Sequence, residues 1–147
     1  MPSKATAVWM GSVRGGKGTV STATGALHDA TYSFATRFEG IHGDADAGTT
    51  PEELIAAAHA SCYSMALSAL LGAAGLTPYS IQTQATVTLA KVDEGFAITR
   101  IALSTTANVP GANREVFKQA AADAKAGCPI SKLFANNTEI TLDAKLM

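Results

Sequence analysis

The alternation of apolar and polar side chains predicts β-strands at both ends of the chain. Residues 32–38 and 139–146 alternate with a period of two, which places every second side chain on the same face of a strand. In the first of these segments the aromatic residues share one face, and Arg37 points to the other. Short apolar or β-branched runs on either side of a glycine-rich stretch predict two further strands, at 5–11 and 19–24.

A long apolar helix is predicted at the centre of the sequence. Thr50 is suited to cap a helix, Pro51 fits its first position, and Glu53 completes the capping-box pattern with Thr50. The helix should end near residues 72–75, because Pro78 cannot continue it. Nearly all of its faces are apolar, so a chain of this size has difficulty covering it, and a second copy of the chain would complete its burial.

The second half of the sequence combines long strands with shorter helices. We expect strands over 80–92 and 96–105, an amphipathic helix over 113–126, and a short helix that opens at Cys128 and Pro129. This order of elements is not a βαβ series. It predicts an α+β fold in a single domain that spans residues 1–147.

The composition excludes several classes of protein. Apolar residues make up 47% of the chain, which excludes disorder. The net charge of −1 does not indicate the basic surface that is typical of proteins that bind nucleic acid. Two cysteines are too few for a secreted disulfide scaffold, and no signal peptide is visible, so we expect a cytoplasmic protein. Its two cysteines are then either a reduced pair or a catalytic pair that cycles between thiols and disulfide. The sparse charge also leaves little polar surface for a monomer and favours an oligomer.

The apolar segment 54–76 also has the length of a membrane span. It carries no charged side chain. However, it is rich in alanine, contains several serines and His59, and lacks a flanking basic cluster. We therefore expect a helix of a soluble protein and no membrane partner.

Two common kinds of ligand site are not supported by the sequence. Gly16 and Lys17 lie in a stretch that nearly matches a phosphate-binding loop, but Gly18 stands where Ser or Thr is needed, and a strand follows in place of a helix. The three histidines are scattered and no Cys-x-x-Cys pair exists. We expect no metal site and no bound cofactor.

The candidate chemistry centres on two cysteines. Cys62 lies within the long helix, where it is either an inert small hydrophobe or, with His59 one turn before it, an activated thiolate. His59 is equally suited to a hydrogen bond within the core. Cys128 precedes Pro129 at a helix start, where unpaired N–H groups and the helix dipole can stabilise a thiolate. The alternative for Cys128 is a poor cap in a loop.

Two charged residues complete the set of candidates. Arg37 is the single charge within the aromatic segment 32–38, and Glu52 lies in the first turn of the long helix without a capping role. Their simpler interpretations are a strand arginine that faces water and a carboxylate that favours the helix dipole. The spacing of these residues along the sequence does not show whether either of them lies near the cysteines.

Five sequence motifs extend over nearly the whole chain. They are GKGTVST (16–22), TRFEG (36–40), TPEELIAAAHASCYSMALS (50–68), KVDEGFAIT (91–99) and KAGCPIS (125–131). Together they resemble the OsmC branch of the OsmC/Ohr family, peroxide-detoxifying proteins of bacteria. The acidic stretch 42–48 departs from the family pattern and leaves the motif positions intact.

The resemblance implies an OsmC-like fold, with N-terminal strands, a long buried central helix, a second sheet region with further helices, and an intertwined homodimer. It implies a thiol peroxidase that reduces organic hydroperoxides to alcohols in oxidative or osmotic stress defence. Cys62 matches the peroxidatic cysteine and Cys128 the resolving one. Arg37 matches the arginine that contacts the reactive sulfur, and Glu52 the glutamate that holds this arginine. The reductant would be a dithiol, such as the dihydrolipoyl groups of lipoylated proteins, and no metal, haem or flavin is implied.

Two other functions remain open on the same residues. A different dithiol/disulfide oxidoreductase would use the same cysteine pair. A non-enzymatic stress or ligand-binding protein would keep the fold with inert thiols. Consumption of peroxide in the presence of a dithiol distinguishes the three.

Overall fold

The computed structural model describes residues 1–39 and 48–147. These residues form two compact units, Met1–Leu54 and Ile55–Met147, and each is described here by itself. The single domain expected over residues 1–147 stays a prediction. Except for Gly48, the acidic stretch 42–48 lies outside the described residues.

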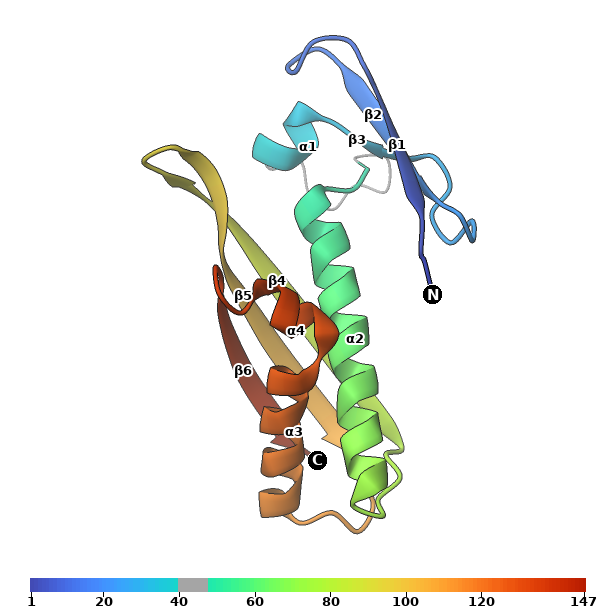
Figure 1. Ribbon diagram of the computed structural model, residues 1–147, viewed down its shortest axis with the longest axis vertical. Coiled ribbons are helices and arrows are strands. Elements are labelled where there is room, and N and C mark those ends of the chain that lie inside the picture. Colours follow the sequence, from blue (N-terminus) through green and yellow to red (C-terminus); the bar gives the residue numbers. More distant parts are fainter. Residues whose placement is uncertain (40–47) are drawn as a thin grey trace. The chain divides into compact units, whose positions relative to one another are not determined.

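The first unit contains a three-stranded antiparallel sheet in the order β1-β2-β3 (Figure 1). Strands β1 and β2 form a hairpin across the glycine-rich stretch, which confirms that this stretch connects two strands. Gly18 lies beneath the ring of Tyr32 on the neighbouring strand, where an added Cβ would collide with the ring. The strand bounds are Ala5–Met10, Lys17–Thr22 and Ala30–Tyr32.

The strand predicted over residues 32–38 is wrong for most of its length. Only β3 is extended there, and the chain then forms a short helix, α1 (Phe34–Phe38). Ser33 caps this helix: its hydroxyl accepts from the N–H of Thr36, and its own N–H donates to the Thr36 hydroxyl at 2.8 Å. This capping box outweighs the alternating pattern. Arg37 therefore lies on a helix and not on the outer face of a strand.

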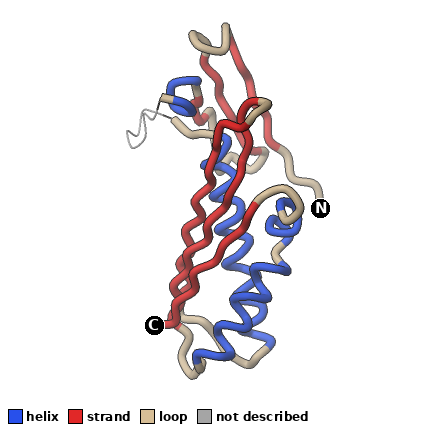
Figure 2. The backbone as a smooth tube through the Cα atoms, turned by 90° about the vertical axis from the view of Figure 1, so that its left-hand side faces the viewer, coloured by secondary structure: helices blue, strands red, loops and turns tan. Residues whose placement is uncertain are grey.

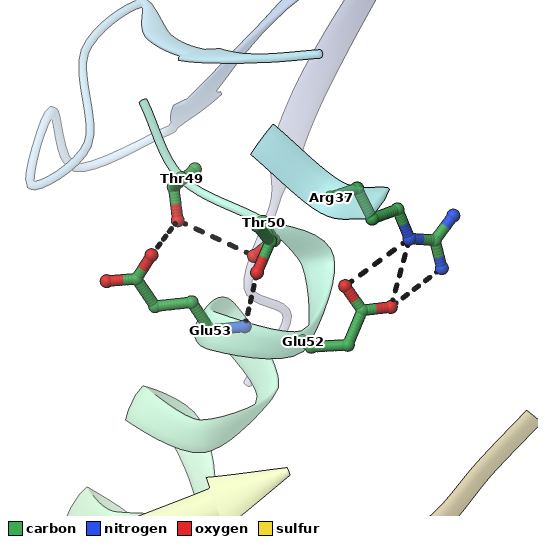
Figure 3. Close-up of polar contacts among 5 residues, drawn as sticks. All are labelled: Arg37, Thr49, Thr50, Glu52 and Glu53. Atoms are coloured by element: carbon green, nitrogen blue, oxygen red, sulfur yellow. Dashed lines mark hydrogen bonds and ion pairs between the residues drawn. The ribbon is translucent and has the colours of Figure 1, made fainter. Parts of the chain in front are cut away.

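The long helix α2 (Pro51–Ala73) forms as the sequence predicts. The N–H of Glu53 donates to the Thr50 hydroxyl at 3.0 Å, which confirms Thr50 as the cap (Figure 3). The Glu53 carboxylate accepts a hydrogen bond from the Thr49 hydroxyl at 3.1 Å. Both acidic residues of the first turn lie where the positive end of the helix dipole favours negative charge.

The second unit combines a three-stranded sheet with helices on one of its faces. Strand β5 is central, antiparallel to β4 and parallel to β6. Figures 1 and 2 show α2 and α3 lying side by side across the same face of this sheet. The bounds are β4 Ser80–Val92, β5 Gly95–Asn108, α3 Arg114–Gly127, α4 Pro129–Phe134 and β6 Glu139–Leu146. All five elements were predicted, and β5 extends past residue 105.

The core of this unit is shared among α2, β5 and α3. It is formed by side chains at the spacings expected for an amphipathic helix and a half-buried strand. The fully buried members include Tyr63, Leu67, Leu71, Ile101, Phe117 and Ala124. The α+β fold class is therefore confirmed.

Only one face of α2 is buried by the rest of the chain that the structure describes. Tyr63, Leu67 and Leu71 are fully buried in the core, whereas Met65 is 75% exposed. By length and composition α2 is apolar enough to cross a membrane, and 22% of its apolar window is buried. The predicted buried helix is thus observed on one face. The described residues leave the opposite face uncovered.

Candidate functional site

Cys62 and Cys128 lie together in the second unit. Their Sγ atoms are 2.8 Å apart, and both residues are free cysteines. Cys62 projects from the middle of α2 and is half-buried, while Cys128 is fully buried. The fold therefore brings together two thiols that are far apart in the sequence, at a separation that leaves little movement for disulfide formation.

Cys128 is held in this position by the local sequence around it. It follows the last residue of α3 and is also the N-cap of α4, with Pro129 at the first helical position. The thiol makes no capping hydrogen bond to the helix that it precedes. Its Sγ instead donates to Cys62. The prediction that Cys128 lies at a helix start is confirmed.

The surroundings of Cys62 oppose ionisation of its thiol. Burial raises the pKa of Cys62, and the hydrogen bond and charge of Cys128 raise it further. A hydrogen bond from the backbone N–H of Ile130, in the first turn of α4, acts in the opposite direction. The net effect of these neighbours is a raised pKa of the Cys62 thiol.

Arg37 and Glu52 form an ion pair in the first unit. Nη2 of Arg37 donates to Oε1 of Glu52 at 2.7 Å, and Nε donates to both carboxylate oxygens at 3.1 and 3.3 Å (Figure 3). The Glu52 side chain is 11% exposed and that of Arg37 is 37% exposed. The guanidinium carbon also lies 5.2 Å from the centroid of the Phe38 ring. These contacts fix the direction of the guanidinium group. Arg37 is therefore not a strand arginine that faces water, whereas the place of Glu52 in the first turn of α2 agrees with both the ion pair and the helix dipole.

The four predicted site residues thus occur as two pairs. The pair of α1 and α2, Arg37 with Glu52, belongs to the first unit, and the pair of α2 and α4, Cys62 with Cys128, belongs to the second. The first pair supplies a fixed cation, and the second supplies a dithiol.

His59 is hydrogen-bonded within the core, one of the two arrangements left open by the sequence. Its Nε2 lies 2.8 Å from the hydroxyl Oγ of Ser131, and both side chains are buried. Burial also lowers the pKa of His59. Sequence reasoning missed Ser131 entirely. The available signal was its position one turn after Cys128, which mirrors the position of His59 one turn before Cys62.

A cavity of about 500 Å³ lies in the second unit between α3, α4 and β6. Its wall is mostly apolar, with Lys125, Ser131 and Thr138 as the polar members, and neither cysteine lines it. Among residues 1–39 and 48–147, no group of three His, Cys, Asp or Glu side chains is placed to hold a metal ion.

Comparison with known sequences gives matches over nearly the whole chain. The family described as OsmC-like protein matches residues 42–143. A protein of Escherichia coli (strain K12) named Peroxiredoxin OsmC is 54% identical over 143 residues, covering 97% of this chain and 95% of that protein. Peroxiredoxin OsmC of Shigella flexneri matches with the same identity and coverage.

Solved structures share the fold at lower sequence identity. The organic hydroperoxide resistance protein OhrB of Bacillus subtilis superimposes with a TM-score of 0.71 at 24% identity, covering 97% of this chain and 98% of that one. An OsmC-like protein from Mycoplasma pneumoniae gives a TM-score of 0.75 at 15% identity, covering 100% and 98%.

Proposed function

Because this chain belongs to the OsmC-like protein family and is a cysteine-based peroxidase, we propose that it reduces organic hydroperoxides to alcohols at Cys62. The observation that carries the proposal is the 2.8 Å separation of the Cys62 and Cys128 sulfurs. Two cysteines with a purely structural role have no need to meet across two helices, whereas a peroxidatic and a resolving cysteine must.

In the first step the Cys62 thiolate attacks the terminal oxygen of the hydroperoxide. The O–O bond breaks, the alkoxide takes a proton and leaves as alcohol, and Cys62 becomes a sulfenic acid. Arg37 is assigned to stabilise the thiolate, since its guanidinium stays charged at neutral pH. Support for this role comes from the raised pKa of Cys62, which a nearby cation would lower, and from the Glu52 carboxylate that orients Arg37.

In the second step the Cys128 sulfur attacks the sulfenic sulfur of Cys62. The S–S bond forms, the S–O bond breaks, and the hydroxyl leaves as water with the Cys128 proton. An external dithiol then reduces the disulfide by exchange and is itself oxidised to a disulfide. We assign this reductant to the dihydrolipoyl class, on the resemblance of the sequence alone. No metal or organic cofactor takes part in the proposed cycle.

The proposed active form is a homodimer in the reducing cytoplasm. Its support is the uncovered apolar face of α2, with Met65 at 75% exposure, and the exposed apolar side chains of β1, including Val8 at 52% and Met10 at 70%. Surfaces of this kind on a chain with so few charges are typical of protein interfaces. We assign a role in oxidative or osmotic stress defence on the resemblance of the sequence alone.

The test of the function uses reduced protein and cumene hydroperoxide. With a dithiol present, wild-type protein should turn over continuously, and Cys62→Ser should consume no peroxide above the buffer rate. Without a dithiol, Cys128→Ser should consume one equivalent in a single turnover and leave Cys62 as a sulfenic acid, which dimedone traps for mass spectrometry. Turnover by Cys62→Ser, or unmodified Cys62 in Cys128→Ser after peroxide treatment, would refute the assignment.

A further inference from the structure

A buried polar pair joins the same two helices as the cysteines. Nε2 of His59 on α2 lies 2.8 Å from Oγ of Ser131 on α4. His59 is 0% exposed and Ser131 is 3% exposed. His59 stands one turn before Cys62, and Ser131 stands one turn after Cys128, so α2 and α4 are connected once through polar groups and once through sulfur.

The protonation state of His59 indicates which group donates this hydrogen bond. Burial lowers the pKa of His59, so the ring is neutral and carries one proton. Within the part of the chain that the structure describes, Nδ1 is buried without a hydrogen-bond partner. With the proton on Nε2, the ring donates to the Ser131 hydroxyl and leaves Nδ1 as an unpaired acceptor; the other tautomer would leave a buried N–H donor unpaired. Among the described residues, the polar contact that orients the ring therefore comes from α4.

Helix α4 needs such contacts because it is only six residues long. A helix of this length does not persist without tertiary packing. The His59 ring provides two contacts to it, the Ser131 hydrogen bond and a ring contact with Phe134 at 6.4 Å between centroids. Both contacts come from the turn of α2 that precedes Cys62.

The position of α4 determines what meets the Cys62 sulfur. The Cys128 thiol, at the N-cap of α4, lies 2.8 Å from it. The backbone N–H of Ile130, in the first turn of α4, donates a hydrogen bond to it. A displacement of α4 would withdraw the resolving thiol and the N–H donor at the same time.

We propose that His59 and Ser131 are positioning residues for the resolving step: their hydrogen bond holds α4 against α2 so that Cys128 reaches the Cys62 sulfenic acid before a second peroxide does. This proposal rests on the proposed function. The two fates of the sulfenic acid are distinct. Attack by the Cys128 sulfur forms the disulfide and releases water, whereas a second hydroperoxide transfers an oxygen, leaves as alcohol, and yields an irreversible sulfinic acid.

The experiment measures how the sulfenic acid divides between these fates. Reduced protein is mixed with increasing cumene hydroperoxide in the absence of dithiol, and intact-protein and peptide mass spectrometry give the fractions of disulfide and of Cys62 sulfinic acid. Ser131→Ala and His59→Leu should each lower the peroxide concentration that gives half overoxidation by at least about tenfold, which corresponds to about 1.4 kcal/mol at the resolving step. The double variant should resemble the single ones, because each already breaks the same contact.

Two further variants separate positioning from general stability. Ser64→Ala is the matched control, since the Ser64 hydroxyl also projects from α2 and donates at 2.8 Å, but to Thr83 on β4. It should leave the overoxidation threshold unchanged even where it lowers the melting temperature. His59→Gln retains a hydrogen-bond donor on the side chain. The peroxide concentration that gives half overoxidation should therefore lie between the values for His59→Leu and wild type.

The outcomes distinguish the two proposals. Equal thresholds for wild type, Ser131→Ala and Ser64→Ala would overturn the positioning role while leaving the peroxidase cycle intact. An equal fall of the threshold in Ser131→Ala, His59→Leu and Ser64→Ala that follows their melting temperatures would do the same. Wild-type protein that forms neither a disulfide nor a sulfenic acid with peroxide would overturn the proposed function itself.

Discussion

The Glu52 carboxylate accepts hydrogen bonds from Nη2 and Nε of the Arg37 guanidinium, at 2.7 and 3.1 Å. This contact uses one edge of a planar group and fixes the direction of the rest. Bidentate pairs of this kind add geometric specificity to a charge–charge attraction. The arginine is therefore held as an oriented cation, and its geometry matters as well as its charge.

Arg37→Lys should lower kcat/KM for cumene hydroperoxide by at least about tenfold, a cost of about 1.4 kcal/mol in the transition state. A lysine ammonium keeps the charge but cannot donate to Glu52 through two fixed nitrogens and still present a third donor in a defined direction. Steady-state kinetics with a dithiol reductant measures the effect. Arg100→Lys is the control, because Arg100 is exposed and its contact with Thr141 is long, at 3.5 Å. Equal rates for wild type and Arg37→Lys would mean that charge alone is required.

The rate of the first oxidation should increase with pH, because the thiolate is the nucleophile and the surroundings of Cys62 raise its pKa. Cys128→Ala removes a hydrogen bond and a charge that both raise this pKa, so its pH profile should move to lower pH. Arg37→Gln removes the proposed stabilising cation, so its profile should move to higher pH. Stopped-flow measurement of single-turnover oxidation gives both profiles. A shift of Cys128→Ala to higher pH would contradict the described environment of the sulfur.

The buried phenol of Tyr63 should make folding stability fall at alkaline pH. Burial raises the pKa of Tyr63 to about 12, while an unfolded tyrosine titrates near pH ~10. The native state therefore disfavours the phenolate, so the contribution to stability is complete below pH ~10 and is lost as the pH rises toward about 12.

Tyr63→Phe should show a smaller loss of stability in that alkaline range than wild type. At neutral pH it should be less stable by about 1 kcal/mol, because the Tyr63 hydroxyl donates to the carbonyl of Ala121 at 3.3 Å. Urea unfolding across the pH range measures both effects. Tyr79→Phe is the matched control, since Tyr79 is 84% exposed and should behave as wild type at every pH. Parallel curves for wild type and Tyr63→Phe would refute the expected titration.

Charge on the uncovered face of α2 should dissociate the proposed homodimer. Met65→Lys places an ammonium on a side chain that is 75% exposed in the single chain and would be buried in the interface. Sedimentation equilibrium should show a dimer for wild type and a shift of at least about a hundredfold in the dissociation constant for Met65→Lys, on the scale of an unpaired buried charge. Gln84→Lys, on the exposed face of β4, should remain dimeric. Wild-type protein that sediments as a monomer would refute the dimer.

Bulky organic hydroperoxides should react faster than hydrogen peroxide. Apolar side chains next to Cys62 on α2, among them Ala58, Met65 and Ala66, provide surface against which an alkyl or aryl group can be buried. Each Å² of apolar substrate surface buried contributes about 25 cal/mol, and hydrogen peroxide has almost none. We expect kcat/KM for cumene hydroperoxide to exceed that for hydrogen peroxide by at least about tenfold, measured with one dithiol. Equal values would show that the substrate meets no apolar surface beside the sulfur.

The sequence by itself determined the elements whose formation depends on local interactions. Thr50 and Pro51 start α2, Pro129 places Cys128 at a helix start, and the alternation over 139–146 matches the bounds of β6. Caps, proline geometry and short periodicities act between near neighbours in the chain, so they can be read from the sequence. The segment after Tyr32 was mispredicted because two local signals competed there, and the capping box of Ser33 and Thr36 prevailed over the alternation.

Tertiary structure alone decided which candidate side chains meet. The sequence left His59 between activation of Cys62 and a hydrogen bond in the core, and the fold pairs it with Ser131. Likewise, no spacing rule could predict that the Cys62 and Cys128 sulfurs lie 2.8 Å apart, since this depends on how α2 and α4 pack around a shared core. Such contacts arise from the burial of apolar surface between elements distant in the sequence, and they exist only once the chain has folded.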